Sequence, residues 1–325
     1  MNSRSVSVPR RSVLTGLAAI PASVAGAATT GFDPKNAEAM SRFDVRYRTL
    51  TVGDVDVFFR EAGPADSPVI LLLHGFPTSS HMFRNLIPEL ADRFRVIAPD
   101  LPGFGRTKSP PRDRFEYSFD KLAKVIGDFV DHLGVTRYAL YVFDYGAPTG
   151  FRLAVAHPER VTAIVTQNGN AYVEGFSKDW APWQTYWREP TPEHREVCRA
   201  SLTDAEIWRQ YSQGAPADRL APDGALLDMF YMRRPDADEI QLDLILSYRT
   251  NVALYPAFQA YFREHQPSLL AVWGKNDPYF LPPGAEAFTR DLPKAEIHFV
   301  ESGHFALETH HVEIAAYMRN FLTHD

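Results

Sequence analysis

A short stretch near the middle of the chain places the strongest constraint on its fold. An apolar run, Tyr138 to Phe143, leads into Asp144, and after a few mostly small residues a segment with helical character follows, Pro148 to Ala156. Gly146 and Ala147 fit a turn where bulky neighbours would clash, and proline is tolerated in a first helical turn. The pattern is typical of a nucleophile elbow, the strained turn that lifts one reactive side chain above a parallel sheet.

The side chain that such a turn would lift is the carboxylate of Asp144. The stretch alone leaves a second interpretation open, because an aspartate at the end of a strand can also cap the helix that follows it. The residues at the other strand ends of the chain decide between a nucleophile and a helix cap.

Strand-like and helix-like segments alternate along most of the chain. We expect strands at residues 43–51, 55–60, 69–73, 95–98, 138–143, 161–166, 268–273 and 296–300. We expect helices at residues 80–93, 119–133, 148–156, 284–291 and 309–322. The first two strands form a hairpin that turns at Gly53. Together the segments predict an α/β fold with a mostly parallel, doubly wound sheet.

The alternation stops after the sixth predicted strand. Residues 169–264 contain helical stretches and many aromatic side chains, without a strand-like pattern. We interpret this segment as a helical cap inserted over the carboxyl ends of the strands, where open α/β sheets bind ligands. The predicted core is therefore divided into residues 28–168 and 265–325.

The first residues differ in composition from the rest. Arg4, Arg10 and Arg11 precede a mildly apolar run, Val13 to Ala27, that ends in small residues. The run is too short and too weakly apolar to span a bilayer stably, and the paired arginines resemble a twin-arginine export signal. We therefore expect residues 1–27 to direct export, and the protein to be periplasmic or secreted.

Charge and cysteine content argue against several classes of partner and site. The formal net charge is −6, and removal of the predicted signal, which holds three arginines and no acid, would make it more negative. Such a surface argues against nucleic acid or an anionic membrane as a partner. Cys198 is the only cysteine, so neither an internal disulfide nor a cysteine-based metal site can form.

Two further loops leave predicted strand ends at the same edge of the sheet as Asp144. One contains Asp277, after the strand that ends at Trp273, and the other contains His304, after the strand that ends at Val300. Nucleophile, acid and histidine thus follow the chain order of α/β-hydrolases. A histidine can accept a proton from water, and a carboxylate on its other nitrogen fixes its tautomer and stabilises the imidazolium.

Residues from about 43 to 325 resemble an α/β-hydrolase of the branch that contains epoxide hydrolases and haloalkane dehalogenases. The motifs that carry the resemblance are His74-Gly75-Phe76-Pro77, Asp100-Leu101-Pro102-Gly103-Phe104-Gly105, Asp144, Asp277 and His304. Each is weak alone, but all occur in order at predicted strand ends. The resemblance implies that Asp144 is a nucleophile, that Asp277 and His304 complete its triad, and that no cofactor or metal is needed.

In that branch the carboxylate attacks an electrophilic carbon to give an alkyl ester on the enzyme. A water activated by the histidine then attacks the carbonyl carbon of the ester, and backbone N–H groups hold the oxyanion. The matching donors would be the backbone N–H groups of Phe76 and Tyr145. Asn168 and Asn170 occupy the loop where some relatives carry the acid, and since neither is a carboxylate, Asp277 is favoured.

The residues expected to assist the leaving group favour epoxides over halides. Haloalkane dehalogenases usually carry asparagine and tryptophan, as N–H donors to the halide, at the positions of Phe76 and Tyr145. Epoxide hydrolases use cap tyrosines to protonate the epoxide oxygen, and Tyr248 lies in a segment that resembles one of theirs. A second cap segment has Trp183 where tyrosine is expected. Tyr186 could replace it, or Trp183 could donate its indole N–H to a halide.

The resemblance therefore implies a hydrolase with an aspartyl-ester intermediate that acts on epoxides of small apolar molecules. Two alternatives stay open: a haloalkane or haloacid dehalogenase, and a non-catalytic ligand-binding protein on the same fold. Fluoroacetate dehalogenases resemble the chain less at the elbow, where they carry arginine in place of Tyr145.

Overall fold

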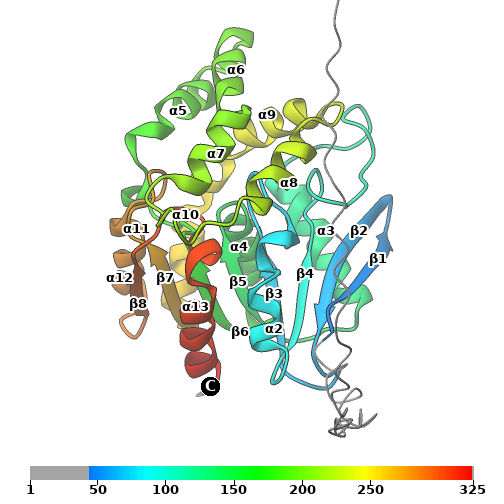
Figure 1. Ribbon diagram of the computed structural model, residues 1–325, viewed down its shortest axis with the longest axis vertical. Coiled ribbons are helices and arrows are strands. Elements are labelled where there is room, and N and C mark those ends of the chain that lie inside the picture. Colours follow the sequence, from blue (N-terminus) through cyan, green and yellow to red (C-terminus); the bar gives the residue numbers. More distant parts are fainter. Residues whose placement is uncertain (1–43, 324–325) are drawn as a thin grey trace, which may run out of the picture.

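An eight-stranded sheet forms the centre of the computed structural model, which describes residues 44 to 323 (Figure 1). The strands are β1 (Arg46–Val52), β2 (Val55–Ala62), β3 (Val69–Leu73), β4 (Arg95–Pro99), β5 (Tyr138–Phe143), β6 (Val161–Gln167), β7 (Ser268–Gly274) and β8 (Glu296–Val300). Their order across the sheet is β1-β2-β4-β3-β5-β6-β7-β8. β2 is antiparallel to both of its neighbours, and the pairings from β4 to β8 are parallel. The predicted α/β fold with a mostly parallel sheet is confirmed.

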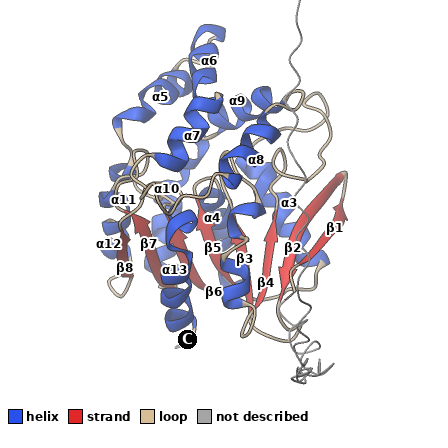
Figure 2. Ribbon diagram, in the orientation of Figure 1, coloured by secondary structure: helices blue, strands red, loops and turns tan. Residues whose placement is uncertain are grey.

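Helices cover both faces of the sheet and one of its ends (Figure 2). The α-helices are α2 (Leu86–Leu90), α3 (Phe119–His132), α4 (Gly146–Ala156), α5 (Ala181–Arg188), α6 (Pro192–Arg199), α7 (Asp204–Ser212), α8 (Asp223–Met232), α9 (Ala237–Ser247), α10 (Arg249–His265), α11 (Pro282–Glu286), α12 (Phe288–Asp291) and α13 (Ala306–Leu322). Short 3₁₀ helices connect some of them, among them η1 (Ser80–Phe83), η4 (Lys178–Trp180) and η5 (Ala200–Leu202).

Two predicted helices are broken in the structure. The helix expected at residues 80–93 is η1 followed, after a break, by the short α2. Pro88 explains the break, because it has no N–H to donate to the carbonyl of Arg84 and its ring would clash with that carbonyl in a continuous helix. The helix expected at 284–291 is divided into α11 and α12 at Ala287.

Alternate side chains of the central strands belong to two separate cores. In β5, Leu140 and Val142 pack in the core that includes side chains of α3, α4, α10 and α12. Ala139 and Tyr141 pack in the core that includes side chains of α2 and α13. This separation follows from the geometry of a strand, whose successive side chains point to opposite faces. Because every residue of β5 is buried, the strand that leads into Asp144 is held from both sides.

Five α-helices between β6 and β7 lie beyond one end of the sheet (Figure 1). These helices, α5 to α9, are called the inserted helices below. α10 differs from them, because it packs against α4 and α12 beside the sheet. The segment predicted as a cap, residues 169–264, thus contains the inserted helices and nearly all of α10.

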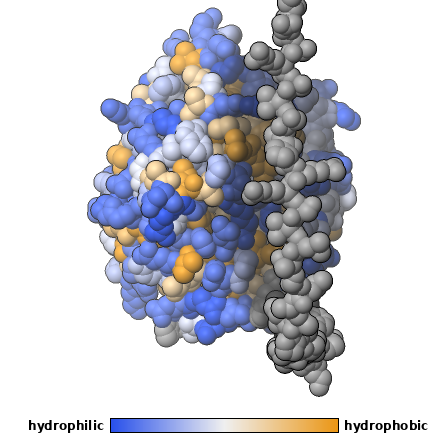
Figure 3. Space-filling view, in the orientation of Figure 1, coloured by the Kyte–Doolittle hydropathy of each residue, from blue (hydrophilic) through white to orange (hydrophobic). Residues whose placement is uncertain are grey.

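The predicted export signal, residues 1–27, lies outside the described residues. Within residues 44 to 323, no helix combines the length and the apolar character that a membrane span requires. The face of the molecule in Figure 3 is mainly hydrophilic, with hydrophobic residues scattered over it.

A buried carboxylate links two of the inserted helices. Asp228 of α8 is fully buried, and its Oδ2 accepts a hydrogen bond of 2.5 Å from the Tyr211 hydroxyl of α7. Its Oδ1 has no hydrogen-bond partner of good geometry, although the hydroxyl of Thr78 lies close to the carboxyl. Burial raises the pKa of Asp228 to about 8, although the hydrogen bond from Tyr211 favours the ionised form. At neutral pH the folded protein therefore holds this carboxyl in its protonated form.

We predict that Asp228→Asn stabilises the protein at pH 8 by about 2 kcal/mol. The unfolded carboxyl ionises near its ordinary pKa of 3.8, whereas the folded group stays protonated up to about 8, so the wild type loses stability as the pH rises between these values. The amide avoids this loss and still accepts the Tyr211 hydroxyl. Thermal unfolding should give a clearly higher Tm for the variant at pH 8 and a small difference near pH 4.

Asp113→Asn provides the matched control, because Asp113 is exposed. Its Tm should follow that of the wild type at both pH values. An equal gain for Asp228→Asn at both pH values would contradict the assignment of a protonated, buried carboxyl.

Candidate active site

β5 and α4 meet in a tight turn around Asp144. α4 begins at Gly146, and Asp144 adopts the left-handed backbone conformation with a φ of 47°, which is strained for a residue other than glycine. The N-cap residue of α4 is Tyr145, whose side chain makes no capping hydrogen bond, so Asp144 lies one residue before the cap position. The turn thus directs the carboxylate of Asp144 away from the helix, at the carboxyl end of β5.

Two glycines let the loop after β3 approach this turn closely. A β-carbon on Gly146 would lie 2.1 Å from the carbonyl oxygen of Leu73, and one on Gly75 would lie 2.3 Å from Oδ1 of Asp144. Both distances are far below van der Waals contact, so a larger residue would push the two segments apart. As a result, the backbone N–H of Phe76 donates a hydrogen bond of 2.6 Å to Oδ1 of Asp144.

The environment of Asp144 balances burial against nearby positive groups. Its exposed fraction is 6%. Burial raises the pKa of Asp144 to about 6, while His304 and the backbone N–H groups of Phe76 and Tyr145 favour the ionised form. The carboxylate is therefore ionised and available as a nucleophile at pH values above about 6.

His304 lies between Asp144 and a second carboxylate. Its Nδ1 donates a hydrogen bond of 2.8 Å to Oδ2 of Asp277, and its Nε2 lies 4.0 Å from Oδ2 of Asp144. The proton is assigned to Nδ1 because an ionised carboxylate can only accept. Burial disfavours the imidazolium, but Asp277 and Asp144 outweigh burial and raise the pKa of His304 above its ordinary value. The separation on the Nε2 side is too long for a direct hydrogen bond, so it allows a water or a substrate atom to contact both groups.

Two residues that follow each other at the end of β6 hold this arrangement in place. Asn168 donates from Nδ2 to Oδ2 of Asp277 at 2.7 Å, and its Oδ1 accepts the backbone N–H of Gly274 at 2.9 Å. Gln167 donates to the carbonyl oxygen of His304 at 2.8 Å. Asn168 therefore supports the acid rather than replacing it. Its position directly after β6, the strand beside β7 that leads to Asp277, is the sequence signal for this role.

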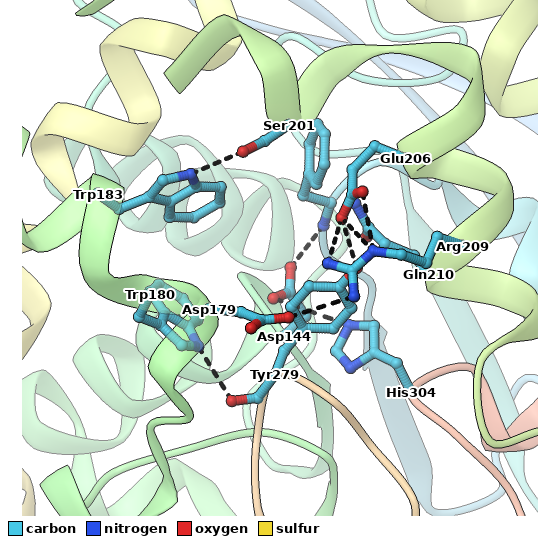
Figure 4. A pocket seen from close by; sticks show the side chains of 11 residues that line it. Asp144, Asp179, Trp180, Trp183, Ser201, Glu206, Arg209, Gln210, Tyr279 and His304 are labelled. Carbon is cyan, nitrogen blue, oxygen red and sulfur yellow. Dashed lines mark hydrogen bonds and ion pairs between the residues drawn. The ribbon is translucent and has the colours of Figure 1, made fainter. Parts of the chain in front are cut away.

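Asp144 and His304 line a pocket between the carboxyl ends of the strands and the inserted helices (Figure 4). The pocket encloses about 510 Å³ of empty space, including the part that is open to solvent. Its lining residues are Phe76, Asp144, Asp179, Trp180, Trp183, Ser201, Glu206, Arg209, Gln210, Tyr279 and His304. The charged residues contributed by η4 and α7 were not identified from the sequence, because nothing in their spacing indicates that they meet.

The remaining predicted residues are placed at different distances from the pocket. Trp183 lines it, but its indole N–H donates to the hydroxyl of Ser201 at 3.0 Å. Tyr186 is not among the lining residues, and its hydroxyl accepts a hydrogen bond of 3.1 Å from Arg195. The backbone of Tyr145 lies at the elbow, whereas its ring is buried in the core against α3.

Tyr248 is fully buried behind the aromatic wall of the pocket. Its ring stacks on Trp187 with 5.5 Å between the centroids, and it lies 4.9 Å from the ring of Trp180, which lines the pocket. Its hydroxyl has no hydrogen-bond partner of good geometry, although the hydroxyl of Tyr255 lies close to it. Burial, and the nearby charge of Asp144, raise the pKa of the Tyr248 phenol well above its ordinary value, so the group keeps its proton at neutral pH.

Comparison with known proteins agrees with the fold. Residues 68–311 match the family model of the alpha/beta hydrolase fold. A Saccharomyces cerevisiae protein described as an uncharacterized hydrolase is 46% identical over 282 residues, which cover 85% of this chain and 97% of that protein. A haloalkane dehalogenase of Mycobacterium marinum is 30% identical over 239 residues, which cover 67% of this chain and 71% of that protein.

The fold is also that of a solved Pseudomonas aeruginosa protein assigned provisionally as an epoxide hydrolase. The TM-score is 0.71 with 21% identity, and the match covers 86% of this chain and 95% of that chain. At this identity the likeness establishes the fold and not the substrate. The family model and the sequence relatives establish the rest: the chain is a hydrolase of the α/β-hydrolase fold family, in the branch that includes haloalkane dehalogenases and epoxide hydrolases.

Proposed function

We propose that this hydrolase opens epoxides through a covalent ester on Asp144. The observation that carries the proposal is the division of the Asp144 carboxylate between two sets of partners. Oδ1 accepts the N–H of Phe76 at 2.6 Å, while Oδ2 faces Nε2 of His304 at 4.0 Å. One oxygen is thus held by a backbone donor, and the other is directed toward the space where a substrate carbon and later a water can lie.

In the first step, Oδ2 of Asp144 attacks an epoxide carbon and the carbon–oxygen bond of the ring breaks. The oxygen that leaves the carbon takes a proton from the Tyr248 phenol, which becomes a phenolate. Because Tyr248 lies behind the pocket-lining Trp180, this transfer requires the substrate oxygen to reach past that ring. The product of this step is an alkyl ester of Asp144 with a free hydroxyl on the neighbouring carbon. The Tyr248 phenol is buried near Asp144, and it makes no hydrogen bond of good geometry with the neighbouring Tyr255 hydroxyl, so its proton can pass to the substrate oxygen.

In the second step, His304 accepts a proton from water and the resulting hydroxide attacks the carbonyl carbon of the ester. Asp277 stabilises the imidazolium through its hydrogen bond of 2.8 Å to Nδ1. The N–H groups of Phe76 and Tyr145 stabilise the oxyanion on Oδ1. Collapse of the intermediate transfers the proton from His304 to the departing diol, and the proton of the new Asp144 carboxylic acid restores the Tyr248 phenol.

The occupied indole N–H groups of the pocket favour an epoxide over a halide. Trp183 donates to Ser201 at 3.0 Å, and Trp180 donates to the carbonyl oxygen of Tyr279 at 3.0 Å. A departing halide would need such donors, whereas an epoxide oxygen needs a proton. The phenol of Tyr248 supplies the proton that an epoxide oxygen needs. Neither indole N–H is free to bind a halide.

Dehalogenation is the second candidate, because the Mycobacterium marinum relative is a haloalkane dehalogenase. The first attack on carbon is the same in both reactions, and only the assistance to the leaving group differs. A ligand-binding protein without catalysis would have no use for a strained aspartate with a φ of 47° that is paired with a buried histidine.

We predict that His304→Gln accumulates a covalent adduct on Asp144, because the ester forms but no base activates water. The variant is incubated with styrene oxide or with 1-bromobutane, and intact mass followed by peptide mapping locates the adduct. We expect an adduct from the epoxide and none from the bromide. The double variant Asp144→Asn/His304→Gln is the control and should give no adduct.

The opposite pattern, an adduct from the bromide alone, would support dehalogenation instead. If a broad panel of epoxides and halides gave no adduct, and Asp144→Ala bound ligands as well as the wild type, both reactions would be excluded.

A second prediction concerns the proton donor. Tyr248→Phe should slow formation of the epoxide adduct by about 100-fold, since the opened ring then leaves as an unprotonated alkoxide. Pre-steady-state mass measurements in the His304→Gln background give this rate directly. Tyr261→Phe is the control, because it removes a different buried phenol, which lies within α10, and it should have little effect. Equal rates with and without the Tyr248 hydroxyl would assign the proton to a different group.

A third prediction tests the support that Asn168 gives to Asp277. Asn168→Ala removes four side-chain hydrogen bonds, of 2.7 Å to Asp277, 2.9 and 3.4 Å to Gly274, and 3.0 Å from Gln167. It also leaves alanine, which has no polar side chain to bond locally, at a backbone φ of 48°. We expect the free energy of unfolding to fall by about 2 to 4 kcal/mol and kcat to fall by about tenfold.

Asn168→Gly is the matched control, because it removes the same hydrogen bonds without the backbone strain. It should recover about 1 kcal/mol of stability relative to alanine but none of the lost kcat. If the glycine variant also regained the wild-type kcat, Asn168 would act only through the backbone.

A further inference from the structure

Four polar side chains form a cluster in the outer part of the pocket. We call this set, Asp179, Glu206, Arg209 and Tyr279, the mouth cluster (Figure 4). The side chains of Asp179 and Arg209 are 30% and 36% exposed, whereas that of Asp144 is 8% exposed. These two members of the mouth cluster are therefore much more exposed to solvent than the reacting carboxylate.

Arg209 has little capacity left to bind a substrate. Its Nε contacts both carboxylate oxygens of Glu206 at 2.9 and 2.8 Å, and its Nη2 contacts Oε1 at 2.6 Å. Its Nη1 donates to Asp179 at 3.2 Å and to Gln213 at 2.8 Å. Most of the N–H groups of the guanidinium are thus already paired within the protein.

Tyr279 keeps Glu206 in this position from the side of the sheet. The hydroxyl of Tyr279 donates to Oε1 of Glu206 at 2.8 Å, and its backbone N–H donates to Oδ1 of Asp277 at 2.7 Å. The guanidinium of Arg209 lies 5.0 Å from the centre of the Tyr279 ring. Glu206 is thus held from two directions, by Tyr279 and by Arg209, and its release of Arg209 would break both sets of contacts.

The charges that line the pocket are unequal. Asp144, Asp179 and Glu206 contribute three carboxylates, and Arg209 contributes the one arginine or lysine side chain among the lining residues. His304 is hydrogen-bonded to the buried carboxylate of Asp277, so a positive charge on its ring is already paired there. That charge does not neutralise the carboxylates of the mouth cluster. A carboxylate-bearing substrate would pass the mouth with net repulsion and would find no free arginine inside.

We propose that the mouth cluster selects substrates whose distal group is neutral or cationic and rejects those with a carboxylate. This inference rests on the proposed covalent chemistry at Asp144 and extends it to the rest of the substrate. The reacting end contacts Phe76, Trp180 and Trp183, which are apolar. The distal end lies beside Asp179 and Glu206, where an ammonium or a hydroxyl gains electrostatic or hydrogen-bonding contacts. Haloacids are therefore disfavoured as substrates.

The test compares substrates that differ mainly in charge. 5,6-Epoxyhexanoate, 5,6-epoxyhexanol and 5,6-epoxyhexyltrimethylammonium carry an anion, a neutral hydroxyl and a cation at the end of the chain that is distal to the same epoxide. Bromohexanoate, bromohexanol and bromohexyltrimethylammonium, each brominated at the terminal carbon, form the matching halide series. Each kcat/KM is divided by that of the neutral member, and these ratios are compared between protein variants, so that differences in intrinsic reactivity cancel.

The decisive variant is Asp179→Asn/Glu206→Gln, which removes two negative charges from the mouth while Tyr279 and Arg209 keep acceptors of similar shape. We expect the anion-to-neutral ratio to rise by about tenfold or more and the cation-to-neutral ratio to fall by about tenfold. Added salt should reduce the discrimination by the wild type, which a purely steric effect would not do.

Asp238→Asn/Glu239→Gln is the matched control. It removes the same charge from a pair of acids that bind Arg199 and do not line the pocket. Both ratios should stay at their wild-type values. Equal shifts in the mouth variant and the control, or no shift in either, would overturn the inference.

The two substrate series separate this inference from the proposed reaction. If only the bromides react, the epoxide proposal fails and the charge ratios of the bromide series still decide the role of the mouth cluster. If the neutral epoxide reacts but the ratios do not change in the mouth variant, the reaction stands and the selection by charge is wrong. If no member of either series reacts, both proposals are overturned.

Discussion

The hydrogen bond of 2.6 Å from the N–H of Phe76 to Oδ1 of Asp144 is the contact on which the rest of the site depends. It requires the loop after β3 and the turn after β5 to approach so closely that a β-carbon on Gly75 or Gly146 would not fit. β3 and β5 are parallel neighbours, so both loops leave the same edge of the sheet. The contact offsets part of the cost of burying the carboxylate and determines which oxygen is left to face His304.

The other residues of the site are also brought together by neighbouring parallel strands. β6, β7 and β8 are consecutive parallel neighbours, and the segments after them carry Asn168, Asp277 and His304. Their side chains form one hydrogen-bonded line, from Asn168 to Asp277 at 2.7 Å and from Asp277 to His304 at 2.8 Å. Because each member follows a different strand, the line forms only when β6, β7 and β8 are paired. The geometry of the site is therefore a consequence of strand order rather than of local sequence.

The dependence of the site on strand order explains which of its residues could be predicted from the sequence. Asp144, Asp277 and His304 could be predicted to meet because they follow apolar runs with clear strand patterns, and parallel strands end at one edge. The helix expected at 80–93 was wrong because a single residue, Pro88, outweighs a favourable helical pattern. The pairing of Arg209 with Asp179 could not be predicted, since these residues lie on η4 and α7, whose relative placement depends on tertiary packing without a periodic signal.

The structure thus divides the requirements of a hydrolase between two parts of the chain. The sheet edge supplies groups whose positions tolerate little change, because every one of them is buried and hydrogen-bonded to a neighbouring loop. The inserted helices supply groups that are partly exposed, such as Arg209, and that bond mainly to each other. Substitutions in the inserted helices can alter the charge that a substrate meets without disturbing the line from Asn168 to His304. Tyr279, in the loop after β7, connects the two parts. Its hydroxyl bonds to Glu206 of the mouth cluster and its backbone N–H bonds to Asp277, so a change at this residue affects both.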